Sequence, residues 1–430
     1  MLIKRVLILS IFFFSGYLAQ DIARAEEVLT WNDCLVEAKK NNPDLISAAE
    51  GISEQKAGKA IAASTLYPQV NANLYASTAK TSSDSGGSIT SSTKDSYSYG
   101  LDGTQLIFDG FQTVNKVKAA SQDIKAAEQN FRFTSSQVRL DLRSAFIDLL
   151  RSQEMINVAR DILKIRRDNL LLIAMRYEAG LEHRGALLTA EANVSQADYE
   201  LAQAEREVEV NQRKLAKAMG RREFKPVLAK GDFVVRDNAN NKPDFQELIK
   251  RNPSLLQAIA QKNSAAFSLR SAYGSFSPQL SGSGGIDKSG SHWSPKGDGY
   301  NAGLNLTMPV FEGGLRIAQV NQAKALYNQA DANERSIRDA ALVSLGQSWA
   351  DLKDTITVVD VQHQTLQAAE ERAKISEAQY SIGFITFDNW IIIQDDLVKA
   401  KRNYLNAQAD ALLAEANWIY AKGETLEYAQ

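Results

Sequence analysis

The chain has 430 residues, 44% hydrophobic and 23% charged, which is enough for two or three ordinary globular domains. Its 49 Lys and Arg nearly balance its 51 Asp and Glu, so a net charge of −2 gives no general reason to bind nucleic acid. A single cysteine, Cys34, excludes an intramolecular disulfide and a cysteine-based metal cluster. His183, His292 and His363 lie far apart in sequence, so we expect no metal and no cofactor.

The N-terminus has the pattern of a secretory signal peptide. Lys4 and Arg5 precede an apolar run over residues 6–14, and Ala23-Arg24-Ala25 is an A-x-A-type cleavage site. We therefore predict a signal peptide over residues 1–25. The alternative is an N-terminal membrane anchor, for which the apolar run is too short. The residues before Cys34 are not those of a lipidation site, so a buried free thiol is expected.

The rest of the chain is a tandem duplication. Asn42-Pro43 and Pro68-Gln69 recur 210 residues later, whereas Phe108-Asp109-Gly110 recurs as Phe311-Glu312-Gly313 after 203 residues. The two offsets differ by seven residues, which predicts a length change between residues 69 and 108. The predicted organisation is a first repeat over 26–220, a linker over 221–243, a second repeat over 244–423 and a tail over 424–430.

Each repeat contains a long helical hairpin. Neither Gly nor Pro occurs between Phe111 and Ala179, or between Ala186 and Met219, and Gly180 lies in the turn between these segments. This predicts helices of about 65 and about 35 residues, the first about 100 Å long. Heptad spacing predicts coiled-coil packing. The heptad positions are Leu142, Leu149, Ile156, Leu163 and Leu170, matched in the second copy by Leu345, Leu352, Val359, Leu366 and Ala373.

Strands precede each long helix. Val70, Ala72 and Leu74 alternate with polar residues, as do Tyr97, Tyr99 and Leu101 and, in the second copy, Ala302, Leu304 and Leu306. Their length and alternation suit transmembrane strands, with apolar residues facing lipid and Asn, Ser, Thr and Gly facing water. A soluble hairpin that caps the helices is the alternative. We expect loops over residues 80–95 and 287–298, the second shorter than the first, within the interval where the seven-residue difference lies.

Four strands are too few to close a barrel, because the smallest bacterial barrels have about eight. Open strand edges are not tolerated in lipid. If these strands span a membrane, several chains must contribute to one barrel, so the chain is expected to be an oligomer.

Several short motifs resemble those of one protein family. Leu29-Thr30-Trp31, Asn42-Pro43-Asp44-Leu45, Tyr67-Pro68-Gln69, Leu106-Ile107-Phe108-Asp109-Gly110 and the repeated Tyr-x-x-Gly at Tyr177 and Tyr380 resemble TolC-like outer membrane efflux proteins. The resemblance covers essentially the whole mature chain. It implies an α+β membrane protein, a homotrimer with a 12-stranded outer membrane β-barrel, four strands per chain, joined to a long periplasmic α-helical coiled-coil tunnel. The implied location is the cell outer membrane, with extension into the periplasm.

The resemblance also implies where partners dock. The two turns would form the periplasmic tip, where a periplasmic adaptor protein binds and brings an inner-membrane transporter. Glycine reaches the positive φ that such turns use. The alternative is a plain turn without a partner. The candidate docking residues are Tyr177, Gly180, Leu181, Tyr380, Gly383 and Phe384.

A gate is expected near the same tip. Ile392 stands where some members of the family carry a gate Asp, so nearby Asp388, Asp395 and Asp396 are our candidates. In a trimer each inward-facing acid forms a ring of three like charges. Asp388 and Asp395 are seven residues apart and share one helix face, which we expect to line the pore. The alternative is that all three acids are solvated on the outer face.

The sequence contains no arrangement of nucleophile, histidine and acid that predicts an enzyme. The predicted function is an outer membrane channel-tunnel that conducts substrates passively out of the periplasm, within a tripartite efflux pump or a type I secretion system. A structural trimeric coiled coil, periplasmic or at the cell surface and without a pore, is the alternative.

Overall fold

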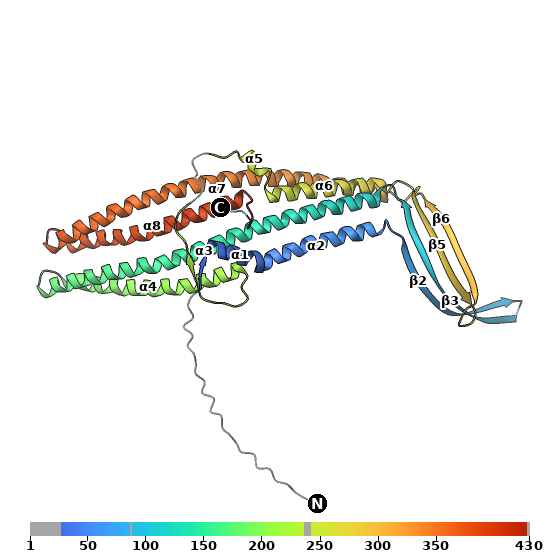
Figure 1. The fold of residues 1–430 in the computed structure, drawn as a ribbon, viewed down its shortest axis with the longest axis horizontal. Coiled ribbons are helices and arrows are strands. Elements are labelled where there is room, and N and C mark those ends of the chain that lie inside the picture. The colour runs from blue at the N-terminus through green and yellow to red at the C-terminus, as the bar shows by residue number, and fades with distance from the viewer. Residues whose placement is uncertain (1–26, 87, 236–241, 428–430) are drawn as a thin grey trace, which may run out of the picture.

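The computed structural model describes residues 27–86, 88–235 and 242–427, and the expected signal peptide lies outside these ranges. The described chain is elongated (Figure 1). A four-stranded sheet forms one end, two helical hairpin turns form the other, and the long helices run between them.

The long helices agree with the prediction. α3 (Gln112–Glu178) and α7 (Leu315–Ser381) each have 67 residues, and they are followed by α4 (Arg184–Met219) and α8 (Phe387–Ala421). The shorter helices α2 (Pro43–Ser64) and α6 (Pro253–Gly274) have 22 residues each. These three matched pairs confirm the duplication. The remaining helices are α1 (Trp31–Asn41) and α5 (Phe245–Ile249).

The repeated Asn-Pro motif fixes both helix starts. The Asn42 carboxamide oxygen accepts hydrogen bonds from the backbone N–H groups of Asp44 and Leu45, and Asn252 does the same for the equivalent residues of α6. Proline follows at the first helical position, where its missing N–H costs nothing. The Asn42 amide also donates to the Ala218 carbonyl at 3.0 Å, which ties the start of α2 to the end of α4.

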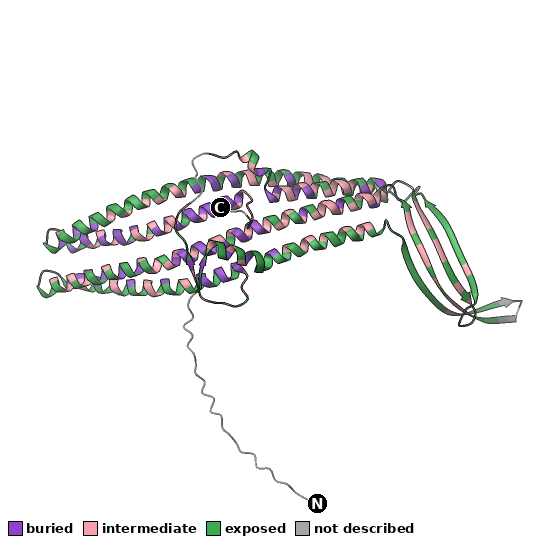
Figure 2. Ribbon diagram, in the orientation of Figure 1, coloured by how far each residue is buried: buried purple, intermediate pink, exposed green. Residues whose placement is uncertain are grey.

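The predicted heptads form the helix seams. Leu142, Leu149, Leu345 and Leu352 are buried, and α3 packs on α4 as α7 packs on α8. α3 also contacts α6 and α8, so the two repeats lie side by side. Figure 2 shows the buried residues as stripes along these helices. The stripes leave the opposite helix faces open to solvent or to neighbouring chains.

The sheet has the order β2-β3-β5-β6, with all neighbours antiparallel. Its strands are β2 (Gln69–Ser85), β3 (Ser88–Phe108), β5 (Gln279–Gly290) and β6 (Gly297–Thr307). The expected loop over residues 80–95 is wrong, because β2 and β3 stay paired as far as Ser85 and Ser88. Ser and Thr fill both paired segments, and Thr favours strands. Strand extension therefore accounts for the longer first hairpin.

A small parallel sheet was missed by the sequence analysis. β1 (Glu27–Thr30) pairs with β4 (Val227–Lys230), which lies inside the segment predicted as a linker. Leu29 and Val227 pack with Leu142, Leu149 and Cys34 in one apolar cluster. Cys34 is fully buried as expected, and burial raises the pKa of its thiol to about 12. This pairing and the apolar cluster hold residues 27–30 against α3.

The helices of the described ranges include none long and apolar enough to cross a membrane.

Candidate functional site

The four-stranded sheet has one apolar face and one polar face. Directly paired residues on neighbouring strands point to the same side of a sheet, so the register assigns each residue to a face. The apolar face carries Val70, Ala72, Leu74, Leu101, Ile286, Tyr300, Leu304 and Leu306. The polar face carries Asn71, Asn73, Asp102, Thr104, Ser283, Asp287, Asn301 and Asn305. The alternation predicted for the segments of β2, β3 and β6 is therefore confirmed, and β5 takes its faces from its register with β3 and β6.

Neither face is covered within one chain. No residue of these strands whose exposure is described is buried, and Figure 2 shows the sheet without a buried stripe. Tyr300 is 89% exposed and Leu304 is 75% exposed. An apolar surface of this kind marks contact with lipid or protein. β2 and β6 also have one unpaired edge each in the four-stranded sheet, where further strands could pair.

The two helical hairpins end in similar turns. Gly180 has φ 69° and Gly383 has φ 79°, the left-handed conformation that glycine adopts without strain. The Leu181 N–H donates to the Arg176 carbonyl, and the Phe384 N–H donates to the Gln379 carbonyl, each at 2.8 Å. These bonds are Schellman caps, which satisfy carbonyls at a helix end. The expected positive φ is confirmed at both turns.

A network of side chains connects the two turns. Tyr380, from α7, stacks on Trp390 of α8 with ring centroids 4.4 Å apart. Its hydroxyl donates to the Glu182 carboxylate at 2.7 Å, and Glu182 belongs to the turn of the other hairpin, between α3 and α4. Arg176 of α3 lies 4.7 Å from the Tyr380 ring and donates to the Tyr380 and Ser381 carbonyls. Burial and then Glu182 raise the pKa of Tyr380, so its hydroxyl stays protonated and remains a donor.

The candidate docking residues separate into two groups. Leu181 and Phe384 are 65% and 76% exposed, so their side chains are available to a partner. Tyr380 is only 1% exposed and holds the tip together from within. Tyr177, its counterpart, is 39% exposed, so the two copies of the Tyr-x-x-Gly motif differ in burial. Ile382, which the sequence analysis did not select, is 79% exposed beside Phe384.

The candidate gate acids also differ from one another. Asp395 of α8 pairs with Arg166 of α3 at 2.6 Å, and Asp396 lies 3.4 Å from Arg372 of α7. Both carboxylates are therefore balanced by a cation of their own chain. Asp388 is exposed in the first turn of α8, where a negative charge is favourable, and no cation of the described residues pairs with it. Sequence spacing placed Asp388 and Asp395 on one face but did not reveal their unequal pairing.

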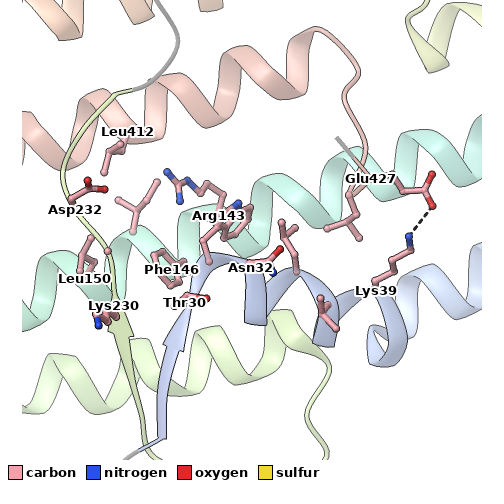
Figure 3. A pocket seen from close by; sticks show the side chains of 16 residues that line it. Thr30, Asn32, Lys39, Arg143, Phe146, Leu150, Lys230, Asp232, Leu412 and Glu427 are labelled. Carbon is pink, nitrogen blue, oxygen red and sulfur yellow. Dashed lines mark ion pairs between the residues drawn. The ribbon is translucent and has the colours of Figure 1, made fainter. Parts of the chain in front are cut away.

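A cavity of about 590 Å³ lies where α1, α3, α8 and the segment after β4 meet (Figure 3). Arg143 stands beside it, 4.9 Å from the Trp31 ring and 4.0 Å from the Glu415 carboxylate. At the rim, Lys39 pairs with Glu427 at 3.0 Å. These contacts connect α1 and the end of the described chain to both repeats. Within the described ranges, His, Cys, Asp and Glu side chains form no group that could hold a metal.

The sheet and the helices together define a class of protein. In this class, a sheet that contributes to a membrane barrel continues into helices that contribute to a tunnel. A family model described as outer membrane efflux protein matches residues 34–221 and 245–423, which is most of the chain. The chain belongs to the outer membrane efflux protein family.

Individual relatives agree with this assignment. The outer membrane efflux protein BepC of Brucella suis is 23% identical over 416 residues, covering 95% of this chain and 88% of BepC. TolC of Escherichia coli is 27% identical over 195 residues, covering 42% of this chain and 39% of TolC. The pyoverdine export outer membrane protein OpmQ of Pseudomonas aeruginosa is 23% identical, covering 95% of this chain and 90% of OpmQ.

Solved structures share the fold. The CmeC outer membrane channel of Campylobacter jejuni matches with a TM-score of 0.83 and 18% identity, covering 93% of this chain and 87% of CmeC. The outer-membrane channel OprN matches with a TM-score of 0.84 and 19% identity, covering 92% of this chain and 90% of OprN. The tunnel-and-barrel fold expected from the sequence is thus confirmed.

Proposed function

We propose that three copies of this chain form one outer membrane channel that conducts substrates passively out of the periplasm. Their sheets combine into a 12-stranded barrel, and their long helices form a tunnel that extends into the periplasm. The channel works within a tripartite efflux pump or a type I secretion system. The sequence has no nucleotide-binding motif, so energy comes from an inner-membrane transporter, reached through a periplasmic adaptor protein.

One observation carries this proposal, namely a sheet that is incomplete in one chain. Its apolar face is exposed, its polar face carries side chains suited to a wet lumen, and both edge strands lack a partner on one side. Lipid covers such an apolar face, and neighbouring copies supply the missing strands. β5 and β6 have 12 and 11 residues, close to the about 9–11 that a tilted transmembrane strand needs.

The structural coiled coil without a pore, which the sequence left open, is not favoured. The chain belongs to a family of efflux proteins, and a rod would have no use for a sheet with an exposed apolar face.

Conductance tests the channel directly. The mature chain, purified from outer membranes in detergent, should insert into planar bilayers and give stepwise currents. A protein that fractionates with outer membranes but never conducts would contradict the proposal. A protein found only in the soluble periplasmic fraction would contradict it as well.

We assign adaptor docking to the exposed residues of the tip, Leu181, Ile382 and Phe384, presented by the turns at Gly180 and Gly383. Their apolar side chains are exposed, whereas Tyr380 beside them in the sequence is buried. Gly383→Asp should leave the trimer in the outer membrane but weaken crosslinking to the adaptor in cells. Gly383→Asn is the matched control, since Asn has nearly the same shape and tolerates positive φ. Equal crosslinking in the native protein and both variants would remove this assignment.

We place the gate at the same tip and expect the Asp388 and Asp395 face to line it. Because Arg166 already balances Asp395, Asp388 supplies the uncompensated charge. Replacing both acids with Ala should lower the cation preference of the channel at normal trimer yield. Asp388→Asn alone should give most of this effect, and Asp395→Asn alone should give little. An unchanged reversal potential in all three variants would contradict the gate assignment and leave the channel itself intact.

A further inference from the structure

The four-stranded sheet contains very few charged residues. Over the part in which all four strands are paired, the charged residues are Asp102, Asp287, Lys288 and Asp298. The register places Lys288 and Asp298 on the apolar face, because they pair directly with each other and lie beside Tyr99. Asp102 and Asp287 lie on the polar face. The two faces therefore differ in charge as well as in polarity.

On the apolar face the charges cancel. The Lys288 ammonium lies 2.7 Å from the Asp298 carboxylate, so this face has no net charge. An ion pair of this kind limits the cost of charged groups near lipid.

On the polar face the charges do not cancel. The Asp102 carboxylate accepts hydrogen bonds from the amides of Asn71 and Asn73, both neutral groups. Neither Asp102 nor Asp287 has an ion-pair partner among the described residues, and the four-stranded part of this face contains no Lys or Arg. Neutral amides donate hydrogen bonds to a carboxylate without cancelling its charge. Each chain thus contributes two uncompensated negative charges to this face.

Glycines keep the space around Asp287 open. Its direct neighbours on β3 and β6 are Gly100 and Gly299. A Cβ atom at Gly299 would lie 2.5 Å from the Asp287 carboxylate, and one at Gly100 would lie 2.9 Å from the Asp287 Cβ. A larger residue at Gly100 would collide with the backbone and Cβ of β5, and one at Gly299 would push the Asp287 carboxylate aside. The carboxylate therefore lies along the wall and provides charge without filling the passage.

We propose that Asp102 and Asp287 make the membrane-spanning part of the channel selective for cations and positively charged solutes. This inference rests on the proposed trimeric channel, in which each acid becomes a ring of three. The pairs Asp102–Gly285 and Asp287–Gly100 lie two residues apart, so the two acids are offset by about 7 Å along the strands. Rings of acidic side chains favour cations in a pore. This filter lies in the barrel and acts whether the periplasmic tip is open or closed.

The test is the cation-to-anion permeability ratio of the reconstituted protein, measured from the reversal potential in a KCl gradient. A unit charge about 10 Å from an ion in water changes the local ion concentration by about twofold. Asp102→Asn with Asp287→Asn removes all six carboxylates of the trimer and should lower the ratio by at least about twofold. The difference should grow as the salt concentration falls, because screening weakens. Asp287→Asn alone should change the ratio in the same direction and leaves the Asp102 hydrogen bonds intact.

The matched control is Lys288→Gln with Asp298→Asn, which removes the neutral pair from the apolar face and should leave the ratio unchanged. Native-like ratios in conducting pores of both acid variants would overturn the inference but not the channel. A ratio that falls equally in the control and in the acid variants would also overturn it, because the effect would then not depend on the polar face. Absence of any conductance from the native protein would overturn the proposed function and this inference together.

Discussion

Asn42 performs two tasks with one side chain. Its oxygen caps α2, and its amide nitrogen holds the last turn of α4 through the Ala218 carbonyl. Asn252 repeats the arrangement in the second copy with the Ala421 carbonyl at 3.4 Å. Only a side chain with both a donor and an acceptor at this length can make both contacts. The local chemistry explains why the same dipeptide marks both repeats.

The first prediction concerns this residue. Asn42→Ala removes the cap and leaves buried backbone groups without partners, so it should destabilise the protein by about 1–3 kcal/mol. The measurement is the thermal unfolding midpoint of the purified protein in detergent. Asn42→Asp retains the cap but loses the amide donor, so its midpoint should lie between the other two. A midpoint for Asn42→Ala equal to the native value would contradict the double role.

Tyr380 gives the second prediction. Tyr380→Phe keeps the stack on Trp390 and the contact with Arg176 but removes the hydrogen bond to Glu182. Losing a hydrogen bond to a charged group costs about 1.5–3 kcal/mol, so the two hairpin turns should separate more easily. Limited proteolysis should then cut faster near residues 178–184. Tyr177→Phe, at the more exposed counterpart, is the control. Equal cleavage rates in both variants and the native protein would argue against a connection through Tyr380.

Among the elements, the long helices could be predicted and the contacts between them could not. Heptads and the absence of Gly and Pro are local signals that located α3 and α4 to within a few residues. The 203-residue repeat then located α7 and α8, although α7 contains Gly346. The Glu182–Tyr380 bond joins residues 198 positions apart, and Arg166 and Asp395 are separated by 229 positions. Whether such residues meet depends on how each helix is rotated about its axis, which spacing within one helix does not determine.

The two short strands of the parallel sheet could not be predicted from the sequence either. β1 and β4 have only four residues each, too few for a period of two to be distinguished from chance. The prediction of a loop over residues 80–95 was wrong for another reason. Its Ser and Thr content resembles a loop, but Thr favours strands, and an antiparallel partner of equal length supplied the hydrogen bonds.

The extended hairpin carries the third prediction. The residues of β3 that precede Tyr97 pair only with β2. The paired segments 79–85 and 88–94 therefore extend past the four-stranded sheet as an appendage. Replacing residues 79–94 with the six residues 291–296 of the second repeat should preserve oligomer yield and single-channel conductance. The reason is that no strand of the four-stranded part loses a partner. Loss of the assembled protein would show that the appendage is needed for barrel formation.

At the scale of the whole molecule, the isolated chain leaves too much unsatisfied to be the functional unit. Both faces of its sheet are uncovered, its two edge strands each lack a partner, and the outer faces of its long helices carry exposed apolar side chains such as Leu171, Val358 and Val361. Each feature calls for neighbours in a different part of the molecule. A single arrangement of three copies around one axis would satisfy all of them, because it closes the barrel and the helical wall together.

The fourth prediction follows from this arrangement. The mature protein in mild detergent should sediment as one species of three chains, with no stable folded monomer at any dilution, because separation exposes strand edges and apolar helix faces at once. Leu304→Asp, on the lipid face, should reduce membrane insertion, at a cost below the about 2–4 kcal/mol that Arg or Lys has near the bilayer centre. Asn305→Asp, on the adjacent lumen-facing position, should insert normally. A stable folded monomer in sedimentation, or equal insertion of the two variants, would contradict the assignment of the sheet faces to lipid and lumen.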